Sequence, residues 1–216
     1  MTEQQLAYSL LSLGYKDYIA SRVLLNNGYP MQGLTLASSA IEKYLKVILA
    51  LNGKTKKEMG VHLDRWDKLK ALITDCYTDI SKFLDERFMI LLGKAYQARY
   101  YDNLSSPITI SFFHNQFIGE LDYMVNFIEK IITLKYASGE ILKSPYQRAV
   151  DEQVADLYFN NYLLNNLSKK DFMELTDTGF AVYINHNNIQ QEIIVEGTNI
   201  KNSYNGTIYE INVEFK

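Results

Sequence analysis

The sequence is poor in the features that mark secreted, disulfide-bonded or membrane-spanning chains. It contains a single cysteine, Cys76, which excludes an intrachain disulfide framework and is typical of a reducing compartment. The residues before the first short apolar run include no basic region, so no secretory signal peptide is expected. No run approaches the roughly 20 apolar residues that a membrane-spanning helix requires. We therefore expect a cytoplasmic protein without membrane association.

Motifs for metals, cofactors and catalysis are also scarce. The histidines His62, His114 and His186 lie far apart from one another and from Cys76, with no pair at the spacing of a zinc site. We therefore expect no metal, no cofactor and no catalytic residues.

Aromatic residues, in contrast, are abundant: the chain has 17 Tyr and 10 Phe, with one Trp. Because its apolar content of 47% is that of an ordinary globular protein, we expect a core rich in aromatic side chains.

Apolar residues recur at helical spacing through the first two thirds of the chain. Residues 7–26 and a run from Pro30 to Asn52-Gly53 predict two helices, and the short turn at Asn26-Asn27-Gly28 makes them antiparallel neighbours. Three further helices are predicted, over about residues 62–76, from an N-cap at Ser81 to about Tyr101, and from Ile110 to about Tyr136.

The last third of the chain begins as a helix and then changes its period. A helix is predicted over about Pro145–Asn165, and an alternation of two residues begins after Asp177-Thr178-Gly179. The predicted strands cover Phe180–Asn185, Gln191–Val195 and Tyr209–Phe215, the last of them preceded by a hairpin turn at Asn205-Gly206. The predicted fold is mainly α. An antiparallel up-and-down helical bundle occupies residues 1–140, and a C-terminal helix with a small antiparallel sheet occupies residues 141–216.

Charge divides the chain in the same place. Residues 1–137 carry a small excess of Lys and Arg, whereas residues 138–216 carry a clear excess of Asp and Glu. A mildly basic bundle tolerates a phosphate-bearing ligand, and an acidic tail repels one. Any anionic ligand is therefore expected on the helical part.

Two positions in the helical part are candidates for binding. Glu42 and Lys46 lie one turn apart in the second helix, where an exposed ion pair that stabilises the helix by a few tenths of a kcal/mol is the favoured interpretation. Arg99 continues the apolar stripe of the fourth helix, so its guanidinium needs a partner near the core. That partner is either a carboxylate, Asp102 or Glu42, or an anionic ligand, for which a planar fork of donors is well suited. The sequence leaves both open.

Four segments together resemble the HEPN family (higher eukaryotes and prokaryotes nucleotide-binding). Tyr18–Gly28 is similar to the first helix of that family, with its Ala-x-Arg and paired leucines. Leu36–Leu49 resembles the second helix, in which an alanine-rich start leads into Glu-Lys-x-Leu-Lys. His62-Leu63 is similar to the start of the third helix, and Ala98–Asp102 to the end of the fourth. The likeness covers about residues 7–135.

The resemblance implies a bundle of four or five helices that commonly dimerises, with polar residues in a cleft near the dimer axis. Members include RNA-cleaving toxins, nucleotide-binding proteins and partners of antitoxins. The RNA-cleaving members have an Arg followed by a His four to six residues later. Here Arg99 is followed by no histidine before His114, so the general acid–base residue of that motif is missing.

We therefore expect a non-catalytic, HEPN-like homodimer that binds a nucleotide, a nucleic acid or a protein partner in a polar cleft. Its predicted ligand-binding residues are Glu42, Lys46, Arg99, Tyr100 and Asp102. One alternative is a metal-independent endoribonuclease in which Arg99 works with a displaced His62 or His114. Another is an interaction module in which the C-terminal region binds a protein partner by edge pairing.

Overall fold

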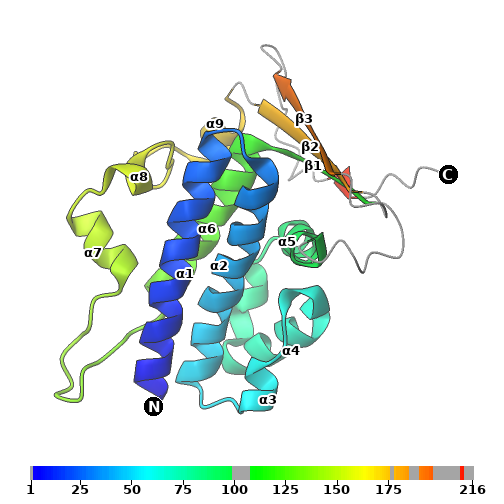
Figure 1. The fold of residues 1–216 in the computed structure, drawn as a ribbon. Helices are drawn as coiled ribbons and strands as arrows, with labels where there is room; N and C mark the ends of the chain where they lie inside the picture. The colour runs from blue at the N-terminus through cyan, green and yellow to red at the C-terminus, as the bar shows by residue number, and fades with distance from the viewer. Residues whose placement is uncertain (1, 99–107, 176–177, 185–189, 197–209, 212–216) are drawn as a thin grey trace.

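The first two helices form an antiparallel hairpin at the centre of the molecule. In the computed structural model, which describes residues 2–98, 108–175, 178–184, 190–196 and 210–211, α1 spans Glu3–Asn26 and α2 spans Pro30–Leu51. Thr2 and Gln5 cap the start of α1 reciprocally, with Thr2 Oγ1 accepting from the Gln5 amide at 3.2 Å. At Gly28 the backbone has φ +77°, which glycine adopts without strain. The two helices therefore lie side by side (Figure 1).

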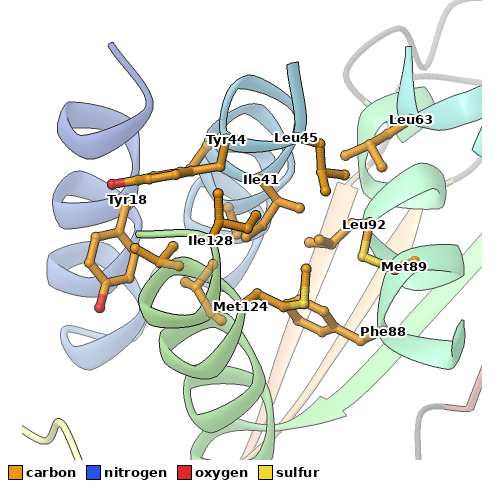
Figure 2. Close-up of a cluster of buried hydrophobic side chains, with 14 of the residues drawn as sticks. Tyr18, Ile41, Tyr44, Leu45, Leu63, Phe88, Met89, Leu92, Met124 and Ile128 are labelled. Carbon is orange, nitrogen blue, oxygen red and sulfur yellow. The ribbon is translucent and has the colours of Figure 1, made fainter. Parts of the chain in front are cut away.

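The second helix is buried along nearly its whole length because other helices surround it. Figure 2 shows Ile41 and Leu45 of this helix between side chains of α5 on one side and α6 on the other. The apolar stripe predicted for α2 is confirmed as core. Its buried members are Leu34, Ala37, Ile41, Leu45 and Ile48.

The chain from α2 to α5 consists of short turns and helices. It contains α3 (Lys56–Met59), η1 (Leu63–Arg65), α4 (Trp66–Cys76), η2 (Thr78–Lys82) and α5 (Glu86–Ala98). The N-cap predicted at Ser81 is wrong, because Ser81 lies inside η2. Asp85 has that role instead: its Oδ1 accepts from the Phe88 amide at 3.0 Å.

The predicted fifth helix is in fact a strand followed by a shorter helix. Strand β1 covers Ile108–Phe113, and α6 covers His114–Ile131 rather than continuing to Tyr136. Ile110 and Phe112 are both buried, so an alternation of two fits these residues as well as the helical spacing of Ile110, Phe113 and Phe117 does. The β-branched and aromatic sequence of β1 favours the strand.

The predicted helix at Pro145–Asn165 is broken into two short ones. Helix α7 covers Pro145–Asp151 and α8 covers Ala155–Tyr158, and Gln153 and Asn160 adopt positive φ of 52° and 51°. The break leaves the Phe159 carbonyl outside any helical ladder, where it accepts a hydrogen bond from Arg22. A further short helix that the sequence did not predict, α9 (Lys169–Met173), packs on α6.

The sheet combines strands from both parts of the sequence. Strand β2 (Thr178–Ile184) pairs antiparallel with β1 on one side and with β3 (Gln190–Glu196) on the other, and β4 (Glu210–Ile211) pairs with β1. The order is β3-β2-β1-β4. The first two predicted tail strands are therefore confirmed within one or two residues. The Asn205-Gly206 turn and most of the last predicted strand lie outside the described residues.

The fold class predicted from the sequence is confirmed: the protein is mainly helical, with a bundle and a small antiparallel sheet. The sheet lies at the end of the bundle where α6 begins (Figure 1). Phe112 of β1 joins it to the core, with ring centroids 5.0 Å from Phe117 and 5.4 Å from Phe180. Among the described residues, no helix has the length and apolar character needed to cross a bilayer.

Candidate functional site

Glu42 and Lys46 form the ion pair predicted for α2, but the pair is not at the surface. Lys46 Nζ donates to Glu42 Oε1 at 2.8 Å, and the two residues are only 8% and 9% exposed. The interpretation as an exposed helix pair is therefore wrong. The pair is buried because the segment that leads into η1 covers this part of α2. The Leu63 amide at the start of η1 donates to Glu42 Oε2 at 3.2 Å.

His62 completes this group from outside α2. Its Nδ1 lies 2.8 Å from Glu42 Oε1, and its side chain is 39% exposed. An ionised carboxylate only accepts hydrogen bonds, so Nδ1 carries the proton in this contact. The other ring nitrogen, Nε2, has no hydrogen-bond partner among the described residues. It is therefore the atom of His62 that can meet a ligand, as an acceptor when the ring is neutral and as a donor when it is protonated.

Tyr96, near the end of α5, stacks on the His62 ring. The ring centroids are 5.4 Å apart and the planes differ by 24°. We call Glu42, Lys46, His62 and Tyr96 the His62 cluster. It joins α2, the segment before η1 and the last turn of the described part of α5, which lies against α2.

The surroundings of Glu42 determine its charge state. Burial tends to raise the pKa of Glu42, but hydrogen bonds from Lys46 and His62 outweigh it and hold the pKa below its usual value. Glu42 is therefore ionised at neutral pH and neutralises Lys46.

A groove of about 450 Å³ lies between α5 and the segment from η1 into α4, and its lining includes Leu63 and Gln97, the chain neighbours of His62 and Tyr96. Its charged residues are Asp64, Arg65, Asp67, Lys68 and Lys94. Within the described residues, none of the three cations takes part in an ion pair. The groove is therefore mildly positive, and its cations are available to an anion.

Of the five predicted ligand-binding residues, the structure places two together, Glu42 and Lys46. Arg99, Tyr100 and Asp102 lie outside the described residues, which end at Ala98 in this part of the chain. Arg99 follows Tyr96 by three positions in the sequence.

The other predicted histidines lie elsewhere. His114 starts α6 and packs edge-on against Phe180, and burial lowers its pKa. Its Nε2 is buried and has no partner among the described residues, so a substrate cannot reach that atom in this arrangement. His186 lies outside the described residues.

The sequence missed the part of the site that depends on tertiary structure. The sequence predicts no contact between His62 and Glu42, because the two residues lie 20 positions apart in different elements. Part of this contact could have been predicted, because a buried turn of α2 that contains both an acidic and a basic residue needs polar partners. A polar residue beside Leu63, at the start of the next apolar stripe, is a natural source of them.

Comparison of the chain with protein-family models, curated proteins and solved structures finds no match. Across the described residues, no group of three or more His, Cys, Asp or Glu side chains is arranged to hold a metal ion.

The packing of α5 against η1 depends on Gly93. A Cβ atom at this position would lie 2.8 Å from the Leu63 carbonyl oxygen, which is backbone and cannot rotate away. We expect Gly93→Ala to lower the free energy of unfolding by about 2 kcal/mol, although alanine favours the helix. Urea denaturation measures this, with Gln97→Ala, an exposed helix substitution, as the control. A stability equal to that of the wild type would contradict the close approach.

Proposed function

We propose that this chain is a non-catalytic, HEPN-like protein that binds a nucleotide or a nucleic acid at the His62 cluster. The observation that carries the proposal is the half-exposed His62 ring, held by Glu42 through Nδ1 and stacked on Tyr96. Such a ring offers a flat face to a base and a nitrogen to a phosphate or a base edge. Arg99, three residues beyond Tyr96, is proposed to supply a phosphate contact, together with Tyr100 and Asp102.

The charges near the cluster support a phosphate-bearing ligand. Arg65, Lys68 and Lys94 line the adjacent groove without ion pairs among the described residues. Lys46 cannot make this contact freely, because Glu42 already binds it. Its proposed role is to keep Glu42 ionised and oriented toward His62.

The proposal also includes a homodimer, which rests on the resemblance to the HEPN family alone. Sedimentation at micromolar concentration tests it, and a monomer throughout that range would remove the dimer from the proposal without affecting the binding site.

The binding proposal is tested with His62→Ala. We expect AMP, or a short single-stranded RNA, to raise the melting temperature of the wild-type protein and to bind His62→Ala at least about tenfold more weakly, since stacking on an aromatic ring stabilises a bound base by about 1–3 kcal/mol. Lys56→Ala, an exposed cation on α3, is the control and should bind as the wild type does. Equal affinities of His62→Ala and wild type would place the ligand elsewhere.

Arg99→Ala separates the phosphate contact from the base contact. A nucleoside without phosphate should bind this variant and the wild type equally, whereas a nucleotide should bind the variant more weakly. Loss of both ligands would contradict the assignment of Arg99 to the phosphate.

A second function, metal-independent RNA cleavage, is favoured by one specific feature. The contact of Glu42 with His62 Nδ1 resembles the way a carboxylate orients a catalytic imidazole, because it leaves Nε2 free to take or give a proton. Incubation of single-stranded RNA with the protein in EDTA tests this, with His62→Ala as the control. Cleavage by the wild type alone would overturn the non-catalytic proposal, and absence of cleavage in both would exclude His62 as an acid–base residue.

A further inference from the structure

Another buried carboxyl group, that of Glu129, lies near the end of α6 that is farther from the sheet. The residue is 3% exposed, and its Oε2 accepts from Ser144 Oγ at 2.7 Å. Its Oε1 is buried without a hydrogen-bond partner among the described residues. An ion pair with Glu129 is likewise absent from the part of the chain that the structure describes.

Ser144 ties this carboxyl group to the segment that follows α6. We call residues 132–151, from the end of α6 to the end of α7, the strap. Ser144 is 2% exposed and is the N-cap of α7, where its Oγ accepts from the Gln147 amide at 3.0 Å. The same hydroxyl therefore holds the start of α7 and donates its proton to Glu129, so the strap and α6 are joined at one atom.

A hollow of about 110 Å³, open to solvent on one side, lies beside Glu129, between Leu11 of α1 and the strap residues Leu134, Ile141 and Leu142. Ile141 is 69% exposed, so this part of the strap makes fewer close contacts than a segment of filled core does.

The groups around Glu129 offer it no positive charge. From α2 it faces the Tyr44 hydroxyl, and from α7 it faces Tyr146. On α6, Asp122 is paired with Arg22 of α1. Of the cations of the strap, Lys143 binds Asp151 at 2.6 Å, Arg148 donates to the Tyr8 hydroxyl, and Lys135 is exposed to solvent. An ionised Glu129 would therefore be a buried charge without a counter-ion, which is costly.

We propose that the strap is a pH-sensitive latch, closed while Glu129 is neutral and bound to Ser144, and released from α6 when Glu129 ionises. Release uncovers Leu11 and the side of α6 that faces the hollow, at a distance in the sequence from the His62 cluster. The proposal goes beyond the binding function and does not depend on it.

The direction of the pH effect follows from protonation of Glu129. Burial raises its pKa from 4.5 to about 7, although the hydrogen bond from Ser144 and the nearby Tyr44 hydroxyl oppose this. An exposed glutamate in the opened strap releases its proton near the usual value. Closure is therefore strongest below about pH 4.5, weakens as the pH rises to about 7, and is constant above that.

Limited trypsin digestion of the full chain at pH 5.5 and pH 8 tests the latch. Cleavage after Arg148, a bond inside α7 that is cut only once the helix opens, is divided by cleavage at Lys56 in α3, which cancels the pH dependence of the protease. The ratio for the wild type is then divided by the ratio for Glu129→Gln at the same pH. We expect this quotient to be about tenfold or more higher at pH 8 than at pH 5.5. Glu152→Gln removes an exposed charge just after the strap, and it should behave as wild type.

Two results would overturn the latch. One is the same wild-type ratio relative to Glu129→Gln at both pH values. The other is a Glu152→Gln protein that loses the pH dependence as Glu129→Gln does. Ser144→Ala keeps the test independent of the glutamine variant: it should be cleaved rapidly at both pH values, and slow cleavage at pH 8 would contradict the role of the Ser144 contact.

Discussion

Replacement of Asp122 by alanine is expected to lower the free energy of unfolding by about 4 kcal/mol at pH 7, because it leaves a fully buried cation without its counter-ion. Asp122 is 1% exposed, and its Oδ1 accepts from both Arg22 and the Tyr18 hydroxyl, the latter at 2.7 Å. Arg22 is 0% exposed and would retain the Phe159 carbonyl and the Tyr18 ring, neither of which carries a negative charge. Urea denaturation measures the difference.

This loss of stability measures the cost of leaving Arg22 without a counter-ion, not the stabilisation that the intact ion pair provides. Arg22→Met combined with Asp122→Leu removes both charges, and we expect this double variant to lose clearly less stability than Asp122→Ala alone. Asp79→Ala, which breaks an exposed pair with Lys82, is the matched control and should change stability little. A double variant less stable than Asp122→Ala would show that the intact pair contributes more than the charge imbalance does.

Burial of Arg22 could have been predicted from the sequence by the argument applied to Arg99. Arg22 lies four residues after Tyr18 and three before Leu25, on the apolar stripe of the first helix. A charged residue on such a stripe predicts a partner in the core. The identity of the partner, Asp122, could not be predicted, since the contact spans 100 residues and depends on how α6 packs against α1.

The helical hairpin and its core were predictable because local signals agree with tertiary packing there. The stripes of α1 and α2, the turn at Gly28 and the helical period all indicate the same arrangement. In β1 the signals conflict: Ile110 and Phe113 fit a helix, whereas Ile110 and Phe112 fit a strand. The strand wins because β2, about 70 residues later, provides its pairing partner. A single sequence window contains no information about that partner.

The break between α7 and α8 has the same origin. Val150, Val154 and Leu157 have helical spacing, yet the chain leaves the helix at Gln153 and Asn160. The Phe159 carbonyl thereby becomes available to Arg22, whose buried guanidinium needs an acceptor. The end of the helix thus coincides with a tertiary hydrogen bond to a buried charged group, and local periodicity cannot predict such a contact.

In the candidate site, too, the local contact could be predicted from the sequence and the tertiary contact could not. The pairing of Glu42 with Lys46 follows from their spacing of four residues, and it was predicted. Burial of that pair and its contact with His62 follow from the way the chain before η1 crosses α2, which the sequence did not indicate. The boundary predicted at residue 140 separates two paired strands, β1 and β2. A chain cut at that boundary would therefore lose the strand that pairs with β1.

Glu42→Ala has the second largest expected effect, a loss of about 3 kcal/mol at pH 7. The substitution leaves Lys46, 8% exposed, without a counter-ion, and it leaves the Leu63 amide without its acceptor. It also frees His62 to rotate, so the nucleotide affinity that we propose should fall in the same variant.

The loss caused by Glu42→Ala should depend on pH in a defined direction. The hydrogen bonds to Glu42 lower its pKa in the folded protein, so their stabilisation is complete above the usual glutamate pKa of about 4.5. It disappears as the pH falls through the lower folded-state value, and the difference between wild type and Glu42→Ala should shrink with it. Urea denaturation from pH 7 to pH 3 measures this difference. A difference that stays constant over that range would mean that Glu42 stabilises the fold through packing rather than charge. Combining Glu42→Ala with Lys46→Met should recover part of the stability but none of the proposed nucleotide binding, because only the loss of stability comes from the unpaired lysine.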